Sequence, residues 1–216
     1  LRNSSAASDV YKRQILGVGD LNGLMRGKRI PADQWPRICG SGNALAMSLF
    51  TMDMTCDVWE TPVVGFANGF PDCHIFPMHP PVAVPWEPGV AMCFARAEGM
   101  DHGPLTVDPR QALLRQVERA AAIGIDLQVG TELEFYLLDP DTGRPRDKGN
   151  DCYGLARAAE LEPVLGPMRR ELAEMGIPIE QSNPEYAAGQ VEVNIRYDSA
   201  MTVSYTHLTL PTSYAV

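Results

Sequence analysis

Two segments of the chain alternate between apolar and polar residues with the period of a β-strand. The first, residues 131–138, contains in order Glu132, Leu133, Glu134, Phe135, Tyr136 and Leu137. The second, residues 190–196, sets Val191, Val193 and Ile195 against Gln190, Glu192, Asn194 and Arg196. Because successive side chains of a strand point to opposite faces, each segment has one apolar and one polar face. The chain is therefore predicted to form a sheet that is covered on one side and carries glutamates on the other.

Helices are predicted before and between these strands. Asp108 is a suitable N-cap and Pro109 fits the first helical position, so a helix is expected over residues 109–123. A second amphipathic helix is expected to begin near Pro163 and to end at Gly176. Its apolar positions are Leu161, Leu165, Met168, Leu172 and Met175. This order of strand, helix and strand is typical of the opening of an α/β or α+β domain.

The N-terminal half of the chain is rich in proline and glycine and contains only short β-like runs. These runs are residues 61–66, 74–76, 82–84 and 90–94. Such frequent turn residues favour a small, mostly β domain with irregular connections. Two further short strands are expected at residues 125–129 and 177–180, next to the predicted helices.

The two ends of the chain contain strings that are related through the genetic code. Residues 9–14 read DVYKRQ, which the codons GAT GTG TAT AAG AGA CAG encode. The reverse complement of that DNA contains, in a shifted frame, the codons that begin VSYTHL, the string at residues 203–208. One inverted-repeat oligonucleotide of the kind used as a library adapter explains both strings. Residues 1–14 and 203–216 are therefore expected to be translated adapter, and the residues between them a truncated insert.

Charge and cysteine content limit the partners and the compartment. The formal net charge is −9, which disfavours binding to nucleic acid or to an anionic membrane surface. No apolar run approaches the roughly 20 residues that a membrane span needs. The five cysteines are widely spaced and never form a C-x-x-C pair, so reduced thiols in the cytoplasm are expected. The predicted partner is a small molecule bound together with a cation.

Four glutamates are predicted to hold that cation, which would be Mg²⁺ or Mn²⁺. They are Glu132, Glu134, Glu185 and Glu192. The first two share one face of a strand, and the other two lie on either side of a turn built from small residues. Magnesium prefers hard oxygen ligands of this kind. The alternatives are a solvated polar face for the first pair and a surface hairpin with polar decoration for the second.

With these motifs the chain resembles the glutamine synthetase family. The matching segments, in the family's order, are DLNGLMRGKRIP, Pro85-Trp86, GPLTVDPR, GTELEFYLL and EYAAGQVEVN. The resemblance implies an α+β protein with a β-grasp domain at residues 15–104. It also implies a truncated catalytic domain at residues 105–202, built on a curved, mainly antiparallel sheet. Such proteins form ring-like homo-oligomers with active sites between adjacent subunits.

The resemblance also assigns roles to single residues. Glu134, Glu185 and Glu192 match the family's three glutamates around the metal that orders the amino-acid substrate. Glu132 matches a ligand of the second metal, which neutralises the nucleotide phosphates. Glu180 and Tyr197 occupy the places of residues beside the nucleotide. The alternatives are a strand-end charge for Glu180 and a core aromatic side chain for Tyr197.

The function implied by the resemblance is that of a carboxylate–amine ligase. Such an enzyme uses ATP to convert glutamate to γ-glutamyl phosphate, from which ammonia displaces phosphate to give glutamine. One alternative is a γ-glutamyl-polyamine ligase, in which putrescine or another amine replaces ammonia. Another is a catalytically silent structural or regulatory protein. Because further catalytic residues of the family lie beyond Thr202, the chain alone is expected to be inactive.

Overall fold

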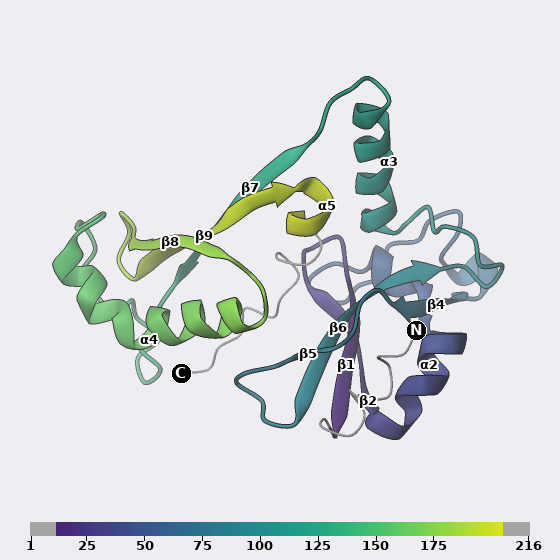
Figure 1. Ribbon diagram of the computed structural model, residues 1–216, viewed down its shortest axis with the longest axis horizontal. Coiled ribbons are helices and arrows are strands. Elements are labelled where there is room, and N and C mark those ends of the chain that lie inside the picture. Colours follow the sequence, from purple (N-terminus) through teal and green to yellow (C-terminus); the bar gives the residue numbers. More distant parts are fainter. Residues whose placement is uncertain (1–11, 205–216) are drawn as a thin grey trace. The chain divides into compact units, whose positions relative to one another are not determined.

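The structure is a computed structural model that describes residues 12–204, and these residues form two compact units (Figure 1). The first unit comprises residues 12–127 and the second residues 128–203. Most of the expected adapter residues lie outside the described part of the chain, whereas Arg13 and Gln14 belong to a strand of the first unit. Within residues 12–204, none of the helices is long and apolar enough to cross a membrane.

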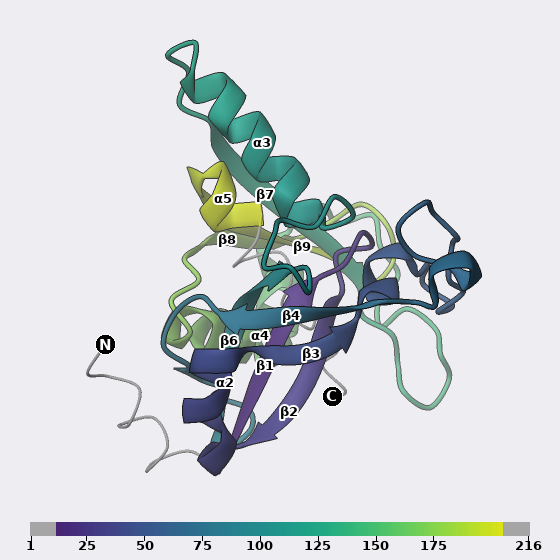
Figure 2. The same cartoon turned by 90° about the vertical axis from the view of Figure 1, so that its right-hand side faces the viewer.

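The first unit is built on a six-stranded sheet (Figure 2). Its strands are β1 (Arg13–Gly19), β2 (Met25–Pro31), β3 (Asn43–Ala46), β4 (Asp72–Pro77), β5 (Val82–Ala83) and β6 (Val90–Glu98). The order across the sheet is β2-β1-β6-β4-β3, and β5 also pairs with β6. The central strands β1 and β6 are parallel, while the other pairs are antiparallel. The first unit is thus a mainly antiparallel sheet around one parallel pair.

The helix α2 (Trp35–Ser41) packs its apolar side chains into the core of this sheet. The largest buried members of the core are Leu16, Trp35, Ile38, Phe50 and Ile75. The strands predicted at residues 74–76, 82–84 and 90–94 are confirmed by β4, β5 and β6. The strand predicted at residues 61–66 is wrong. The hydroxyl oxygen of Thr61 accepts hydrogen bonds from the amides of Val63 and Val64 and so holds a turn there.

One buried side chain of β1 lacks polar partners. Gln14 is 0% exposed and lies on the same side of β1 as the core residues Leu16 and Val18. Within the described part of the chain, neither its amide nitrogen nor its amide oxygen has a hydrogen-bond partner. An unpaired amide in such surroundings is unfavourable, because burial removes its hydrogen bonds to water.

We expect Gln14→Leu to raise the free energy of unfolding of the first unit by about 1–2 kcal/mol, since leucine fills a similar volume without the desolvation cost. Urea unfolding followed by tryptophan fluorescence measures this, because all three tryptophans, Trp35, Trp59 and Trp86, lie in this unit. Gln34→Leu is the matched control, since Gln34 is exposed. An equal gain or loss in both variants would contradict the expectation.

The predicted helix at residues 109–123 is confirmed by α3 (Pro109–Ala121). Its N-cap is Asp108, whose Oδ1 accepts a hydrogen bond of 2.8 Å from the amide of Arg110. Asp108 is only 3% exposed. Burial raises the pKa of Asp108 to about 6, although the amides of Arg110 and Gln111 partly offset this effect. Burial therefore makes the ionised form of Asp108 less favourable in the folded protein than in water.

The second unit is a three-stranded antiparallel sheet covered by one helix (Figure 1). Its elements are β7 (Gln128–Tyr136), α4 (Leu155–Glu174), β8 (Ile179–Pro184), β9 (Gln190–Ser199) and α5 (Ala200–Thr202). The strand order is β7-β9-β8. Leu161 and Leu165 of α4 pack against Val191 and Val193 of β9. The opposite face of the sheet keeps the polar residues, as the alternation predicts.

Three predicted boundaries in the second unit are wrong. The strand expected at residues 177–180 is β8 (Ile179–Pro184). The strands expected at residues 125–129 and 131–138 form the single strand β7, in which Gly130 stands at an irregularity of the pairing with β9. The helix α4 begins at Leu155 rather than near Pro163. A proline often marks a first helical turn, but here the burial of Leu161 against β9 extends the helix through that position.

Candidate metal and nucleotide site

The register of the second sheet places three of the four predicted metal ligands on its polar face. Glu134 of β7 lies directly opposite Glu192 of β9, and Glu132 lies opposite Asn194. Directly opposed side chains of an antiparallel pair have Cβ atoms roughly 4.5–5.5 Å apart. Two glutamates in this position repel each other unless a positive charge lies between or beside them.

The fourth glutamate reaches the same face from the end of β8. Asn183 is paired with Glu192 in the sheet, and its Nδ2 donates a hydrogen bond of 2.9 Å to Glu185 Oε1. Glu185 and Glu192 are both only 8% exposed, whereas Glu132 and Glu134 are exposed. The structure therefore brings Glu134, Glu185 and Glu192 to one region, with Glu132 further along β7.

Within residues 12–204, the hydrogen-bond donors to Glu134, Glu185 and Glu192 are neutral groups, mainly amides, and not cations. Gln190 Nε2 donates to Glu134 Oε2, and Asn194 Nδ2 donates to Glu192 Oε1 at 2.5 Å. Across residues 12–204, none of the four glutamates forms an ion pair with a lysine, arginine or histidine. Asn194 is only 5% exposed, and its Oδ1 has no hydrogen-bond partner in the same range. An orphaned buried oxygen beside uncompensated carboxylates is suited to a cation or to the water bound to one.

The negative field of this region acts on two neighbouring residues. Cys152 Sγ donates a weak hydrogen bond of 3.7 Å to Glu185 Oε2. Burial, followed by the charge of Glu185, raises the pKa of the Cys152 thiol. The charge of Glu185 is also the main cause that raises the pKa of Tyr153. Both residues lie in the loop that precedes α4.

The donor set fits a hard divalent cation, because it consists of carboxylate and amide oxygens. In residues 12–204, however, no three histidine, cysteine, aspartate or glutamate side chains lie close enough together to hold one ion. Glu185, Glu134 and Glu192 instead accept hydrogen bonds from the side-chain amides of Asn183, Gln190 and Asn194, respectively. A bound cation would require the glutamate side chains to rotate away from these amides and toward one another. The assignment of the four glutamates as ligands stays a prediction.

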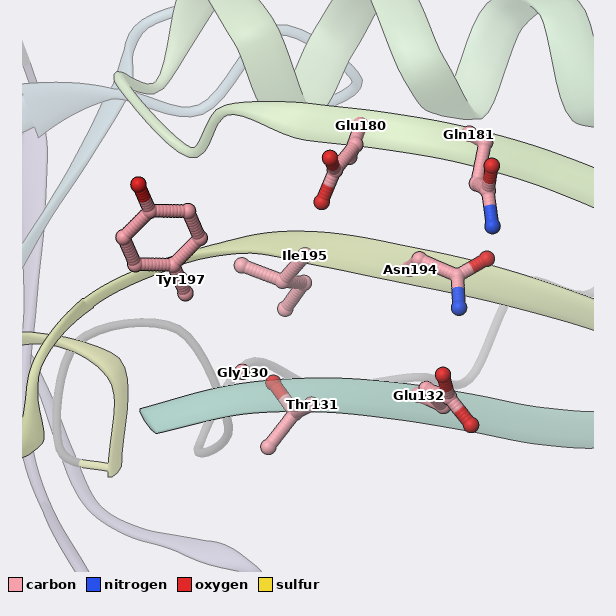
Figure 3. A pocket seen from close by; sticks show the side chains of 8 residues that line it. All are labelled: Gly130, Thr131, Glu132, Glu180, Gln181, Asn194, Ile195 and Tyr197. Carbon is pink, nitrogen blue, oxygen red and sulfur yellow. The ribbon is translucent and has the colours of Figure 1, made fainter. Parts of the chain in front are cut away.

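A cavity of about 520 Å³ lies at the other end of the same sheet (Figure 3). Its lining comes from all three strands and comprises Gly130, Thr131, Glu132, Glu180, Gln181, Asn194, Ile195 and Tyr197. Glu132 and the two residues predicted to lie beside the nucleotide, Glu180 and Tyr197, therefore share one cavity. Asn194 borders both this cavity and Glu192.

Two irregularities of the sheet shape this cavity. Glu180 is an extra residue in β8, since Ile179 pairs with Ile195 while Gln181 pairs with Asn194. On the other side of β9 two residues, Arg196 and Tyr197, lie opposite the single Gly130. Bulges of this kind turn a side chain away from the regular alternation and are common next to active sites. Glu180 and Tyr197 both lie at such a position.

Sequence reasoning missed the residues that support the glutamates. Asn183, Gln190 and Asn194 bind the carboxylates, and the buried Arg157 binds the backbone of the turn that begins with Glu185. One signal was present for the arginine. Arg157 precedes Leu161 and Leu165 at intervals of four residues, so it falls on the apolar stripe of the helix, where an unpaired charge is rare.

Comparison with known proteins indicates the family of the chain. The profile of the family "Glutamine synthetase, catalytic domain" matches residues 106–211. A gamma-glutamylethanolamide synthetase of Streptomyces coelicolor is 31% identical over 94% of the chain and 46% of its own length. A glutamate–isopropylamine ligase of a Pseudomonas species is 27% identical over 86% of the chain and 43% of its own length. A glutamine synthetase of Rhizobium meliloti is 28% identical over 89% of the chain and 42% of its own length.

Solved structures give the same result. The structure described as apo GmaS without ligand superposes with a TM-score of 0.75 at 25% identity, over 93% of this chain and 46% of that one. A GmaS complex with ADP has a TM-score of 0.74 at 26% identity, over 92% of this chain and 44% of that one. The chain thus spans less than half the length of the relatives that it matches. It belongs to the glutamine synthetase family, which includes the γ-glutamyl amine ligases.

Proposed function

We propose that the chain is part of an ATP-dependent ligase that forms γ-glutamyl amides. It would supply the ligands of the metal beside the amino-acid substrate, and part of the pocket for the nucleotide. The γ-carboxylate of glutamate would take the terminal phosphoryl group of ATP, and an amine would then displace phosphate. The observation that carries the proposal is the direct pairing of Glu134 with Glu192, next to the buried Glu185 and without a compensating ion pair in residues 12–204.

The chemistry of phosphoryl transfer explains why such a cluster is useful. The transferred group and the leaving nucleotide are both anionic, so catalysis depends mainly on charge neutralisation and positioning. Bound divalent cations would supply that neutralisation. The residues of this chain would hold them with Glu134, Glu185 and Glu192 toward the amino-acid substrate and with Glu132 toward the phosphates. Asn194, whose Oδ1 has no hydrogen-bond partner among the described residues, would orient a water or ligand oxygen between the two groups.

The cavity lined by Glu132, Glu180 and Tyr197 is the proposed place for the nucleotide. Its volume of about 520 Å³ is within the range of small-molecule pockets. The ADP found in the related GmaS complex supports a nucleotide as ligand. A β-grasp domain before residue 105 and a ring of subunits remain parts of the proposal that follow from family membership.

A small primary amine is the proposed acceptor. It is favoured by relatives that are named for isopropylamine, ethanolamide and methylamine. Ammonia is the second candidate, which several relatives named glutamine synthetase favour, at 27% to 37% identity. In either case the chemistry at the glutamate carboxylate is the same, and only the nucleophile differs.

The metal-binding part of this proposal is tested with Mn²⁺, which is visible by electron paramagnetic resonance. The chain is expected to bind Mn²⁺, and Glu192→Gln is expected to weaken the binding at least tenfold, because it removes one charged ligand from the site. Titration of free Mn²⁺ in the presence of each protein gives the dissociation constants.

Glu174→Gln is the matched control, because Glu174 is an exposed glutamate at the end of α4. It is expected to leave the affinity for Mn²⁺ unchanged. If the chain binds no Mn²⁺, or if both variants lose affinity equally, the proposed site is wrong.

A further inference from the structure

The turn that links β8 to β9 is held by one buried arginine. Arg157, near the start of α4, is only 5% exposed. Its guanidinium donates to three backbone carbonyl oxygens, those of Glu185 at 2.7 Å, Gln190 at 3.2 Å and Ala187 at 3.3 Å. Its remaining hydrogen bonds go to Asp147 Oδ2, at 2.8 and 2.9 Å. One side chain thus contacts both ends and the middle of the turn.

Asp147, the carboxylate that pairs with Arg157, also binds the same turn. Asp147 Oδ1 accepts hydrogen bonds of 2.8 Å from the amides of Gly149 and Gly189. Burial alone would raise the pKa of Asp147, but these two amides and the Arg157 guanidinium outweigh it and lower the pKa. Asp147 therefore stays ionised at neutral pH, and its two oxygens join the loop before α4 to the turn at residues 185–190.

We propose that this Asp147–Arg157 clamp positions Glu185 toward Glu192 for binding the cation. The inference rests on the proposed function, because it concerns the same metal site. It adds two positioning residues that touch no ligand themselves. The clamp fixes the backbone at Glu185, and the carboxylate of Glu185 then needs only side-chain rotation to reach the cation.

The geometry requires an arginine at this position. The planar guanidinium presents five N–H donors in a fixed fork, and here they serve a carboxylate and three carbonyl oxygens. A lysine has one compact ammonium with three donors, so it keeps the charge but cannot hold the whole turn. Arg157→Lys therefore separates the loss of positioning from the loss of charge.

The test measures Mn²⁺ affinity in a double-mutant cycle. Arg157→Lys is expected to weaken Mn²⁺ binding about tenfold, as is common when a residue that orients a metal ligand is changed. In a Glu185→Gln background the same substitution is expected to have no further effect, because Arg157 acts through Glu185. The resonance spectrum of bound Mn²⁺ should also change in Arg157→Lys. Asp147→Asn is the second variant, with the same expected pattern.

Arg169→Lys is the matched control. Arg169 lies on the same helix and joins Glu162 of α4 to Ser182 of β8, but it does not touch the turn. It is expected to leave Mn²⁺ affinity unchanged. Circular dichroism of each variant checks the fold.

The outcomes separate the two proposals. If the unsubstituted chain binds no Mn²⁺, the proposed function fails and takes this inference with it. If the chain binds Mn²⁺ and both Arg157→Lys and Asp147→Asn bind it equally well, only the inference fails. It also fails if the effects of Arg157→Lys and Glu185→Gln are additive, or if clamp variants bind less Mn²⁺ because they are unfolded, since the clamp is then a general stabilising contact.

Discussion

Replacing Gly189 by alanine is expected to destabilise the second unit by about 3 kcal/mol or more. Gly189 has a φ of +73°, and a Cβ atom added there would lie 2.6 Å from the carbonyl oxygen of Leu137. That oxygen cannot move away easily, because the amide of Leu137 donates a hydrogen bond of 2.8 Å back to the Gly189 carbonyl. The substitution therefore combines an unfavourable backbone conformation with a clash between two backbones.

Gly176→Ala separates these two causes. Gly176 lies in the same unit with a φ of +82°, but within residues 12–204 no atom beyond its chain neighbours lies within 4 Å of an added Cβ. Gly176→Ala is expected to lower the free energy of unfolding by only about 1 kcal/mol, which is the cost of the left-handed conformation alone. Hydrogen exchange of the β9 amides measures both losses. Equal losses in the two variants would show that the approach of Leu137 to Gly189 contributes nothing.

The second large effect is a dependence of stability on pH that comes from Asp108. Its pKa is raised from the ordinary value of 3.8 to about 6 in the folded protein. Between these values the folded state binds more protons than the unfolded state, so stability falls as the pH rises. The contribution of Asp108 is thus most favourable below pH 4. It declines by up to about 3 kcal/mol as the pH rises through the folded pKa, with most of the loss by about pH 6, and is constant above about pH 7.

Asp108→Asn removes the titration and keeps an oxygen that can accept the bond from the Arg110 amide. The difference in unfolding free energy between this variant and the original chain is therefore expected to grow in favour of asparagine between pH 4 and 6. Urea unfolding followed by tryptophan fluorescence at several pH values gives this difference. A difference that is independent of pH would contradict the raised pKa.

The pairing of β7 with β9 shows what the sequence could predict. The alternation of apolar and polar residues fixed which side chains share a face, and the buried positions Val191 and Val193 agree with it. Alternation does not determine register, because a shift by two residues keeps every side chain on its face. The direct opposition of Glu134 and Glu192 could therefore be read only from the fold.

Other features depend on contacts between distant segments. The start of α4 was misplaced because a local rule about proline was outweighed by burial of Leu161 against a strand 30 residues further along the chain. The Asp147–Arg157 clamp joins a loop, a helix and a turn, and no local pattern encodes such a meeting. In the first unit, the runs at residues 74–76, 82–84 and 90–94 are strands as predicted, whereas β1 and β2 were not predicted, because glycines interrupt their alternation.

The two bulges of the second sheet separate the strand pairing around Glu134 and Glu192 from the pairing at the opposite end of the sheet. Both lie beside Ile195, whereas the pairing from Glu132 to Tyr136 with β9 is continuous. A one-residue insertion or deletion in this family could be absorbed at the bulges. It would reshape the pocket beside Glu180 and leave Glu134 facing Glu192. The lining of the cavity and the opposition of Glu134 and Glu192 therefore depend on separate parts of the β9 pairing.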